Sequence, residues 1–193
     1  MNKMAKKGQY MQAYKQGEFD ALCGVYSLLN ADRIINRTSY QNSKQLFYSM
    51  MHFLESEGQL SFIISEGTHF RHIKKLLDRV IGIQRIAYQK RHFIKKSDTN
   101  ISTFWNEMMF FLDNYSNRAI LLGMTGVHDH WTVVCKITKR QMILYDSSGM
   151  RFLNRLHCTT GYAMGKRQHI LHPGQTYFLM KEEDNTAKSK QTC

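Results

Sequence analysis

Three side chains of types that cooperate in nucleophilic catalysis are spread over the chain: Cys23, His130 and Asp146. Cys23 follows a polar loop and opens an apolar stretch with helical periodicity, which predicts a cysteine in the first turn of a helix. Asp20 is the predicted N-cap, which would make Cys23 the third helical residue. Helix N-termini favour a thiolate, and Gly24 leaves space for another group to approach the sulfur. The alternative is that Cys23 is a small buried apolar residue of a core helix.

His130 and Asp146 stand at the two ends of a predicted β-hairpin. Residues 130–137 form a β-branched, alternating run, and a short polar turn leads into a second run at 142–145. Antiparallel pairing brings the start of one strand beside the end of the next, so the two side chains can meet across sixteen positions (146 − 130). Alone, Asp146 would be a turn residue, because Asp-Ser-Ser-Gly is typical of turns.

A cysteine at a helix N-terminus and a histidine oriented by a carboxylate can carry out covalent acyl transfer. The histidine takes the thiol proton and later returns it to the leaving group, while the acid holds the imidazole in the required tautomer. His130 is preferred to His128 as this base because it enters the strand directly. Trp131 follows it and can shield the imidazole from water. Cys135, in the same strand, is expected to be a packing residue.

Three blocks of sequence resemble the papain-like superfamily of cysteine peptidases. They are Asp-x-x-Cys-Gly-x-x-x-Leu-Leu-Asn-Ala at 20–31, His-Trp-Thr-Val-Val at 130–134 and Leu-Tyr-Asp-Ser at 144–147. The nearest group is the bacterial C39-like peptidases, and Josephin-type deubiquitinases are a more distant likeness. The resemblance covers about residues 16–150. It implies an α+β fold in which a helical half carries the nucleophile, an antiparallel sheet carries His and Asp, and the site lies in the cleft between them.

The same resemblance implies roles for individual residues. Cys23 would be the nucleophile, His130 the general base and acid, and Asp146 the residue that orients the imidazole. Members of the superfamily usually place an oxyanion-hole glutamine shortly before the cysteine, and Gln16, seven positions upstream (23 − 16), is the candidate. The usual gap is a residue or two shorter.

These roles predict a cysteine peptidase that hydrolyses peptide bonds through a thioester acyl-enzyme. Glutamine deamidation or transamidation, of the effector or toxin type, is a second hypothesis, because the same triad and thioester serve it. A third hypothesis is a catalytically silent, basic binding module, with nucleic acid or an acidic protein as its partner. It predicts binding to polyanions that weakens steeply with salt and no unusual reactivity of Cys23.

Length and composition fit one globular domain, with 193 residues of which 42% are hydrophobic. We expect a mobile N-terminal lead-in at 1–15, a catalytic domain at 16–181 and a disordered polar tail at 182–193. No run is long enough to span a membrane, and no apolar segment follows the basic N-terminus, so no signal peptide is expected. A cytoplasmic protein with reduced thiols is the simpler interpretation, and non-classical export as an effector stays open.

The formal net charge of +12 favours acidic partners, nucleic acid or an anionic surface, although no nucleic-acid-binding motif accompanies it. The expected partner is a protein or peptide substrate, with an acidic one favoured by the charge. His69 and His72 could share a helix face and bind a metal, but no third ligand is in view, so they are expected to face solvent. No metal or organic cofactor is implied, and nothing in the sequence indicates an oligomeric state.

Hydrophobic periodicity also predicts the elements that must position these residues. Besides the helix that contains Cys23, helices are expected at 43–55, 69–80 with Thr68 as N-cap, and 101–115. Strands are expected at 81–88, 93–94, 119–124 and 175–180, with a short apolar segment at 60–64 and loops at 155–168.

Overall fold

The computed structural model describes residues 12–81, 86–89, 99–113 and 117–181. The helices in these residues are α1 (Cys23–Asn36), α2 (Tyr40–Ser56), α3 (Leu60–Glu66), α4 (Phe70–Leu76), a π-helical turn (Leu77–Ile81), α5 (Ile101–Leu112) and a 3-10 turn (Arg155–His157). The strands are β1 (Ile86–Gln89), β2 (Arg118–Gly126), β3 (His130–Ile137), β4 (Gln141–Leu144), β5 (Phe152–Asn154), β6 (Cys158–Thr159) and β7 (His169–Lys181).

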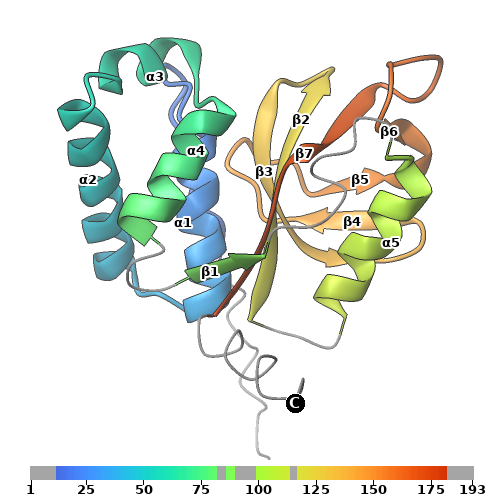
Figure 1. Ribbon diagram of the computed structural model, residues 1–193, viewed down its shortest axis with the longest axis horizontal. Helices are drawn as coiled ribbons and strands as arrows, with labels where there is room; N and C mark the ends of the chain where they lie inside the picture. Colours follow the sequence, from blue (N-terminus) through green and yellow to red (C-terminus); the bar gives the residue numbers. More distant parts are fainter. Residues whose placement is uncertain (1–11, 82–85, 90–98, 114–116, 182–193) are drawn as a thin grey trace, which may run out of the picture.

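The described strands form one seven-stranded sheet in the order β1-β7-β2-β3-β4-β5 (Figure 1). Neighbours along this path are antiparallel, and β6 pairs with β7 in parallel. The predicted hairpin is formed by β3 and β4, with a register shift between Val134 and Lys136. The α+β class predicted from the sequence is confirmed.

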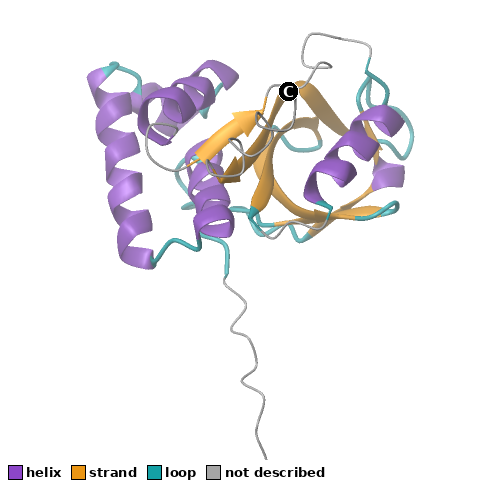
Figure 2. Cartoon of the chain, turned by 60° about the horizontal axis from the view of Figure 1, so that its bottom comes forward, coloured by secondary structure: helices purple, strands orange, loops and turns teal. Residues whose placement is uncertain are grey.

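Helices α1 to α4 lie on one side of the sheet, and α5 lies on the other side of this strongly curved sheet (Figures 1 and 2). Each side has its own hydrophobic core. Trp131 and Val133 of β3 contribute to the core shared with α1, whereas Val134 contributes to the core shared with α5. This split follows from the strand period of two, which sends successive side chains to opposite faces.

The start of α1 differs from the prediction. Its N-cap position is Leu22, without a side-chain cap, so Cys23 is the first helical residue and not the third. The Asp20 carboxylate instead accepts hydrogen bonds from the backbone N–H groups of Gly17 (2.8 Å) and Leu22 (3.1 Å). The predicted cap is wrong because the helix begins at Cys23, and Asp20 instead stabilises the turn at 17–22 that leads into it.

Other predicted boundaries shift by a few residues. The apolar segment at 60–64 is part of helix α3, and α4 takes His69 and not Thr68 as its N-cap. The region 155–168, predicted as loops, contains the 3-10 turn and β6. The predicted strand at 93–94 and the tail at 182–193 lie outside the described residues.

In the part of the chain that the structure describes, no helix combines the length and apolar character needed to cross a membrane. Within the predicted lead-in, Tyr14 is tied to α1. Its N–H donates to Asn30 Oδ1 (2.7 Å), and its carbonyl accepts from Asn30 Nδ2 (3.1 Å). These bonds set the position of the segment that leads to Gln16.

Candidate active site

The structure brings His130 and Asp146 together at the predicted end of the hairpin. His130 Nε2 lies 2.7 Å from Asp146 Oδ2, and the two side chains are 8% and 0% exposed. The other carboxylate oxygen, Oδ1, accepts from Ser148 N–H (2.9 Å), Ser148 Oγ (2.7 Å) and Met150 N–H (3.1 Å). The turn after β4 therefore holds the carboxylate so that its free oxygen points at the imidazole.

Burial and charge have opposite effects on the pKa values of His130 and Asp146. Burial by itself lowers the pKa of His130, but hydrogen bonds and charges from Asp146 and Cys23 outweigh it and raise the pKa to about 9. Burial raises the pKa of Asp146, but the hydrogen bond and charge of His130 hold the pKa of that carboxyl well below its usual range. At neutral pH the pair is an imidazolium and a carboxylate.

Cys23 lies at the first position of α1, half-buried and without a disulfide. Its side chain is near enough to His130 to help raise the pKa of the imidazole. Since Asp146 occupies Nε2 of the imidazole, Nδ1 is the ring nitrogen left for the sulfur. The first N–H groups of α1 have no side-chain cap, so the sulfur sits where a helix stabilises negative charge.

Gln16 is hydrogen-bonded to Ser147, the residue that follows Asp146. Its N–H donates to the Ser147 carbonyl, and Ser147 Oγ donates to Gln16 Oε1, both at 3.2 Å. Because its oxygen is used as an acceptor, the amide end that remains is Nε2, which can only donate. Nε2 has no hydrogen-bond partner within the described residues, and Gln16 lines the same cavity as Cys23.

This cavity is a cleft of about 310 Å³. Its lining comes from the segment that enters α1, the connection from α3 to α4, and the start of β3, whose positions can be followed in Figure 1. The lining residues are Gln16, Asp20, Ala21, Cys23, Glu66, Gly67, Thr68, His69, Asp129, His130 and Trp131. The candidate nucleophile, base and amide thus share one cleft, and Asp146 lies behind His130.

Two buried hydrogen bonds connect the walls of this cleft. Ser27 Oγ, on α1, donates to the Trp131 carbonyl (2.7 Å), and Trp131 Nε1 donates to the Thr68 carbonyl (2.6 Å). They join the helix of Cys23, the strand of His130 and the α3–α4 connection. Sequence reasoning missed this role of Ser27, because a single serine in an apolar helix carries no signal of its partner.

Gly24 has a different role from the predicted one. A Cβ at this position would lie 2.7 Å from Thr68 Cβ and 2.8 Å from Ile73 Cδ1. The absence of a side chain at Gly24 therefore lets Thr68 and Ile73 pack against α1. It does not leave space for a group to approach the Cys23 sulfur. A larger residue would push the Thr68 wall of the cleft away from the helix.

His69 and His72, which could have shared a helix face, lie in different surroundings. His69 lines the cleft, whereas His72 is 2% exposed, and its Nδ1 accepts from the N–H of His69 (3.2 Å). The expectation that His72 faces solvent is wrong, because the ring completes the N-terminus of α4. Within the described ranges, no group of three side chains of ligand type is placed to hold a metal ion.

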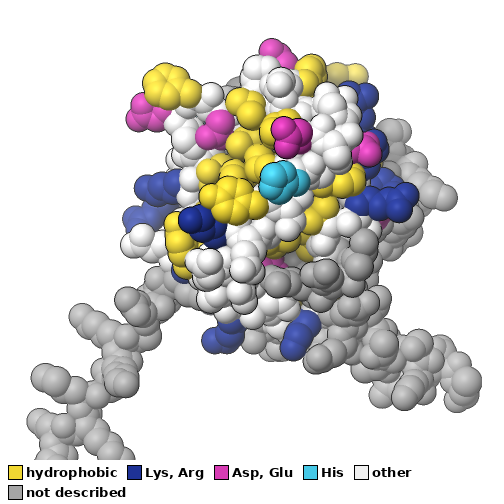
Figure 3. Space-filling model, turned by 90° about the vertical axis from the view of Figure 1, so that its left-hand side faces the viewer, with side chains coloured by type: hydrophobic (Ala, Val, Ile, Leu, Met, Phe, Trp, Pro, Cys, Tyr) yellow, Lys and Arg dark blue, Asp and Glu magenta, His cyan; other side chains and the backbone are white. Residues whose placement is uncertain are grey.

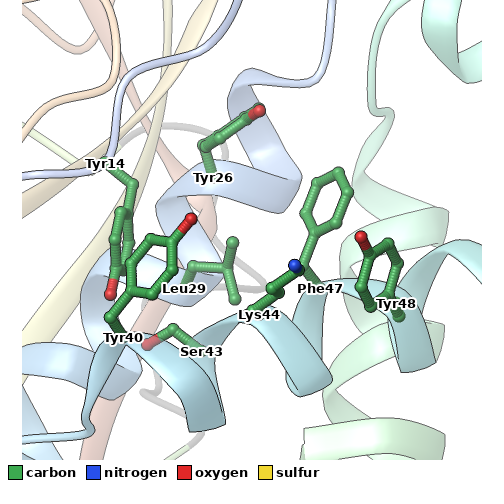
Figure 4. A pocket seen from close by; sticks show the side chains of 8 residues that line it. All are labelled: Tyr14, Tyr26, Leu29, Tyr40, Ser43, Lys44, Phe47 and Tyr48. Carbon is green, nitrogen blue, oxygen red and sulfur yellow. The ribbon is translucent and has the colours of Figure 1, made fainter.

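A second cavity lies between α1 and α2 (Figure 4). We call it the aromatic groove. It has a volume of about 240 Å³ and is lined by Tyr14, Tyr26, Leu29, Tyr40, Ser43, Lys44, Phe47 and Tyr48. Figure 3 shows further hydrophobic side chains among charged ones on the helical face of the molecule. The lining holds no cysteine, histidine or carboxylate, so the groove offers no equivalent chemistry.

Comparison with known proteins yields no relative: no family model, no curated protein and no solved structure matches the chain. The functional assignment therefore depends on the geometry of the cleft.

Proposed function

We propose that the chain is a papain-like cysteine peptidase. The observation that supports this most is the buried His130–Asp146 pair, 2.7 Å apart, beside a cysteine at an uncapped helix N-terminus. A thiol, a base and an orienting acid in one cleft are the set that covalent acyl transfer requires. The resemblance of the three sequence blocks to papain-like peptidases agrees with this chemistry.

In the first half of the reaction, His130 holds the proton of the Cys23 thiol as an imidazolium, and the Sγ thiolate attacks the carbonyl carbon of a peptide bond. A carbon–sulfur bond forms, and the carbonyl oxygen becomes an oxyanion that can accept hydrogen bonds from the Cys23 N–H and Gln16 Nε2. The His130 imidazolium then gives its proton to the leaving nitrogen, and the carbon–nitrogen bond breaks. The products are an amine and a thioester on Cys23.

In the second half, water resolves the thioester. The now neutral His130 takes a proton from the attacking water, the carbon–sulfur bond breaks, and a carboxylic acid leaves the cleft. Throughout, Asp146 keeps Nε2 of the imidazole occupied, so Nδ1 faces the reacting atoms. Burial of the pair maintains this orientation, because neither side chain can exchange its partner for water.

The test is alkylation by iodoacetamide between about pH 5 and 9, read for each cysteine by peptide mass spectrometry. We expect Cys23 to react fastest below neutral pH and to lose this advantage in His130→Ala. Cys158 is an internal reference, because burial raises the pKa of its thiol to about 12. Burial also raises the pKa of Cys135. Equal rates at Cys23 in both proteins, no faster than at Cys135, would contradict the proposal.

The products of turnover distinguish the hypotheses that share this thioester. Hydrolysis of a peptide bond shortens an unfolded protein substrate such as casein, whereas deamidation raises its mass by about one dalton per site. A binding module does neither. Cleaved casein with wild type and intact casein with Cys23→Ala is the result expected of a peptidase.

A further inference from the structure

We infer that the cleft selects peptides with a cationic side chain, lysine or arginine, next to the carbonyl that Cys23 attacks. This inference rests on the proposed function and names its substrate class. It begins from a contrast in charge. The chain carries 27 lysines and arginines against 15 acidic residues, yet no lysine or arginine is among the described residues that line the cleft.

The lining of the cleft includes three carboxylates beside the imidazole of His130. Asp20 lies on the segment that enters α1, Glu66 ends α3, and Asp129 directly precedes His130. The carboxylates therefore occupy three separate walls around the sulfur. Their negative potential is concentrated by the surrounding protein and attracts a cationic ligand into the cleft.

Two of these carboxylates are available to a ligand. Asp20 uses both oxygens to accept backbone N–H groups, which fixes its position. Glu66 and Asp129 are exposed, and within the described part of the chain their carboxylates accept no hydrogen bond, although the charge of Asp129 acts on the imidazole of His172. A lysine or arginine side chain that enters between them would gain charge-assisted hydrogen bonds without displacing a hydrogen-bond donor.

The reactive pair is the second observation that points to a ligand here. Cys23 and His130 open into the same cavity of about 310 Å³, which has room for a substrate side chain beside the attacked carbonyl. An acidic side chain at that place would face Glu66 and Asp129 and would be repelled. The net charge of the whole chain favours an acidic substrate, but the local charge of the cleft favours the opposite one.

The probes are tripeptide chloromethyl ketones that alkylate Cys23 and differ only in their last side chain: arginine, glutamine or glutamate. Each second-order rate constant is measured by intact mass and divided by the rate constant for iodoacetamide, which removes the intrinsic reactivity of the sulfur. We expect the arginine probe to exceed the glutamate probe by about 50-fold at low salt, falling several-fold in about 0.5 M NaCl.

The variants Glu66→Gln and Asp129→Asn each lower the arginine-to-glutamate ratio by about fivefold, in the range of a partly exposed ion pair. Glu18→Gln is the matched control, since Glu18 is exposed on the same segment as Asp20 but outside the cleft lining. It removes the same charge and leaves the ratio within about twofold.

The outcomes separate the two proposals. Rapid iodoacetamide labelling of Cys23 with equal rates for all three probes would overturn the charge selection and leave the peptidase proposal in place. A preference that Glu18→Gln reduces as much as Glu66→Gln would also overturn it, because net charge would then be the cause. An unreactive Cys23 would overturn both.

Discussion

The two cavities that helix α1 helps to line are similar in size and opposite in character. The cleft of about 310 Å³ begins at Cys23 and is lined by acids and histidines, whereas the aromatic groove of about 240 Å³ includes Tyr26, one turn further along. Only in the cleft do a thiol, an imidazole and an acid interact. The two volumes are too similar to separate the cavities, and it is the interacting titratable groups that distinguish the cleft as the proposed active site.

The largest expected difference between the two cavities is in turnover. Cys23→Ala removes the nucleophile, and we expect hydrolysis of casein to fall by about 10³-fold or more. Tyr48→Ala truncates a groove residue that is 50% exposed, and we expect a change of less than about threefold. Both rates come from the release of labelled casein fragments. A loss in Tyr48→Ala as large as that in Cys23→Ala would move the functional site to the groove.

The next largest effect is expected when the buried carboxylate of Asp146 is replaced. Asp146→Asn keeps an oxygen for the Ser148 and Met150 donors but removes the charge opposite His130. We expect turnover to fall by about 10²–10⁴-fold, since the imidazole loses its fixed tautomer. The free energy of unfolding should also fall by on the order of 3 kcal/mol, because His130 stays buried without its counterion. Urea unfolding measures the second effect, and an unchanged midpoint would contradict it.

The same pair predicts how stability depends on pH. His130 has a pKa raised from 6.5 to about 9 in the folded chain, so its contribution is complete below about pH 6.5 and is lost as the pH rises through 9. The pKa of Asp146 is lowered from 3.8, so its contribution is present above that pH and is lost as the pH falls through the folded value.

The stability difference between wild type and Asp146→Asn should therefore be largest between about pH 4 and 6.5 and shrink toward pH 9. Urea unfolding of both proteins at several pH values tests this. The difference in unfolding free energy between wild type and the groove variant Tyr48→Ala should not depend on pH in this way, because Tyr48 does not contact the His130–Asp146 pair. A flat difference for Asp146→Asn would show that the pair does not titrate as described.

The smallest expected effect is on the free energy of unfolding, and it should differ between two buried serines, Ser27 and Ser43. Ser27 Oγ donates to the Trp131 carbonyl at 2.7 Å, whereas Ser43 Oγ is buried without a hydrogen-bond partner among the described residues. Ser27→Ala should cost about 1–3 kcal/mol of unfolding free energy, because the carbonyl is left unpaired. Ser43→Ala should be neutral or stabilising. Thermal or urea unfolding of both variants decides this, and equal losses would contradict it.

The sequence predicted the hairpin and its contact because both are local. The strand period and a short turn bring the start of β3 beside the end of β4, so His130 and Asp146 could be paired without knowledge of the rest of the chain. The helical periodicity after Cys23 was equally local. The cap was not predicted correctly, because Asp20 had two sets of nearby backbone donors and the pattern does not rank them.

The walls of the cleft could not be predicted in this way. Glu66 and Asp129 are ordinary polar residues at the ends of a helix and a loop, and only the packing of α3 and β3 around α1 brings them to one cavity. The role of Gly24 was misread for the same reason, since its neighbour is Thr68, which is far away in sequence.

By itself, the sequence determined the α+β class and the hairpin that pairs two of the three candidate catalytic side chains, because these follow from periodicity and turn chemistry over short spans. Only the tertiary structure decided which side of α1 holds the cleft, what charge lines it, and how Ser27 and Trp131 connect its walls. These features depend on contacts between segments distant along the chain, and such contacts leave no periodic signal in a single sequence.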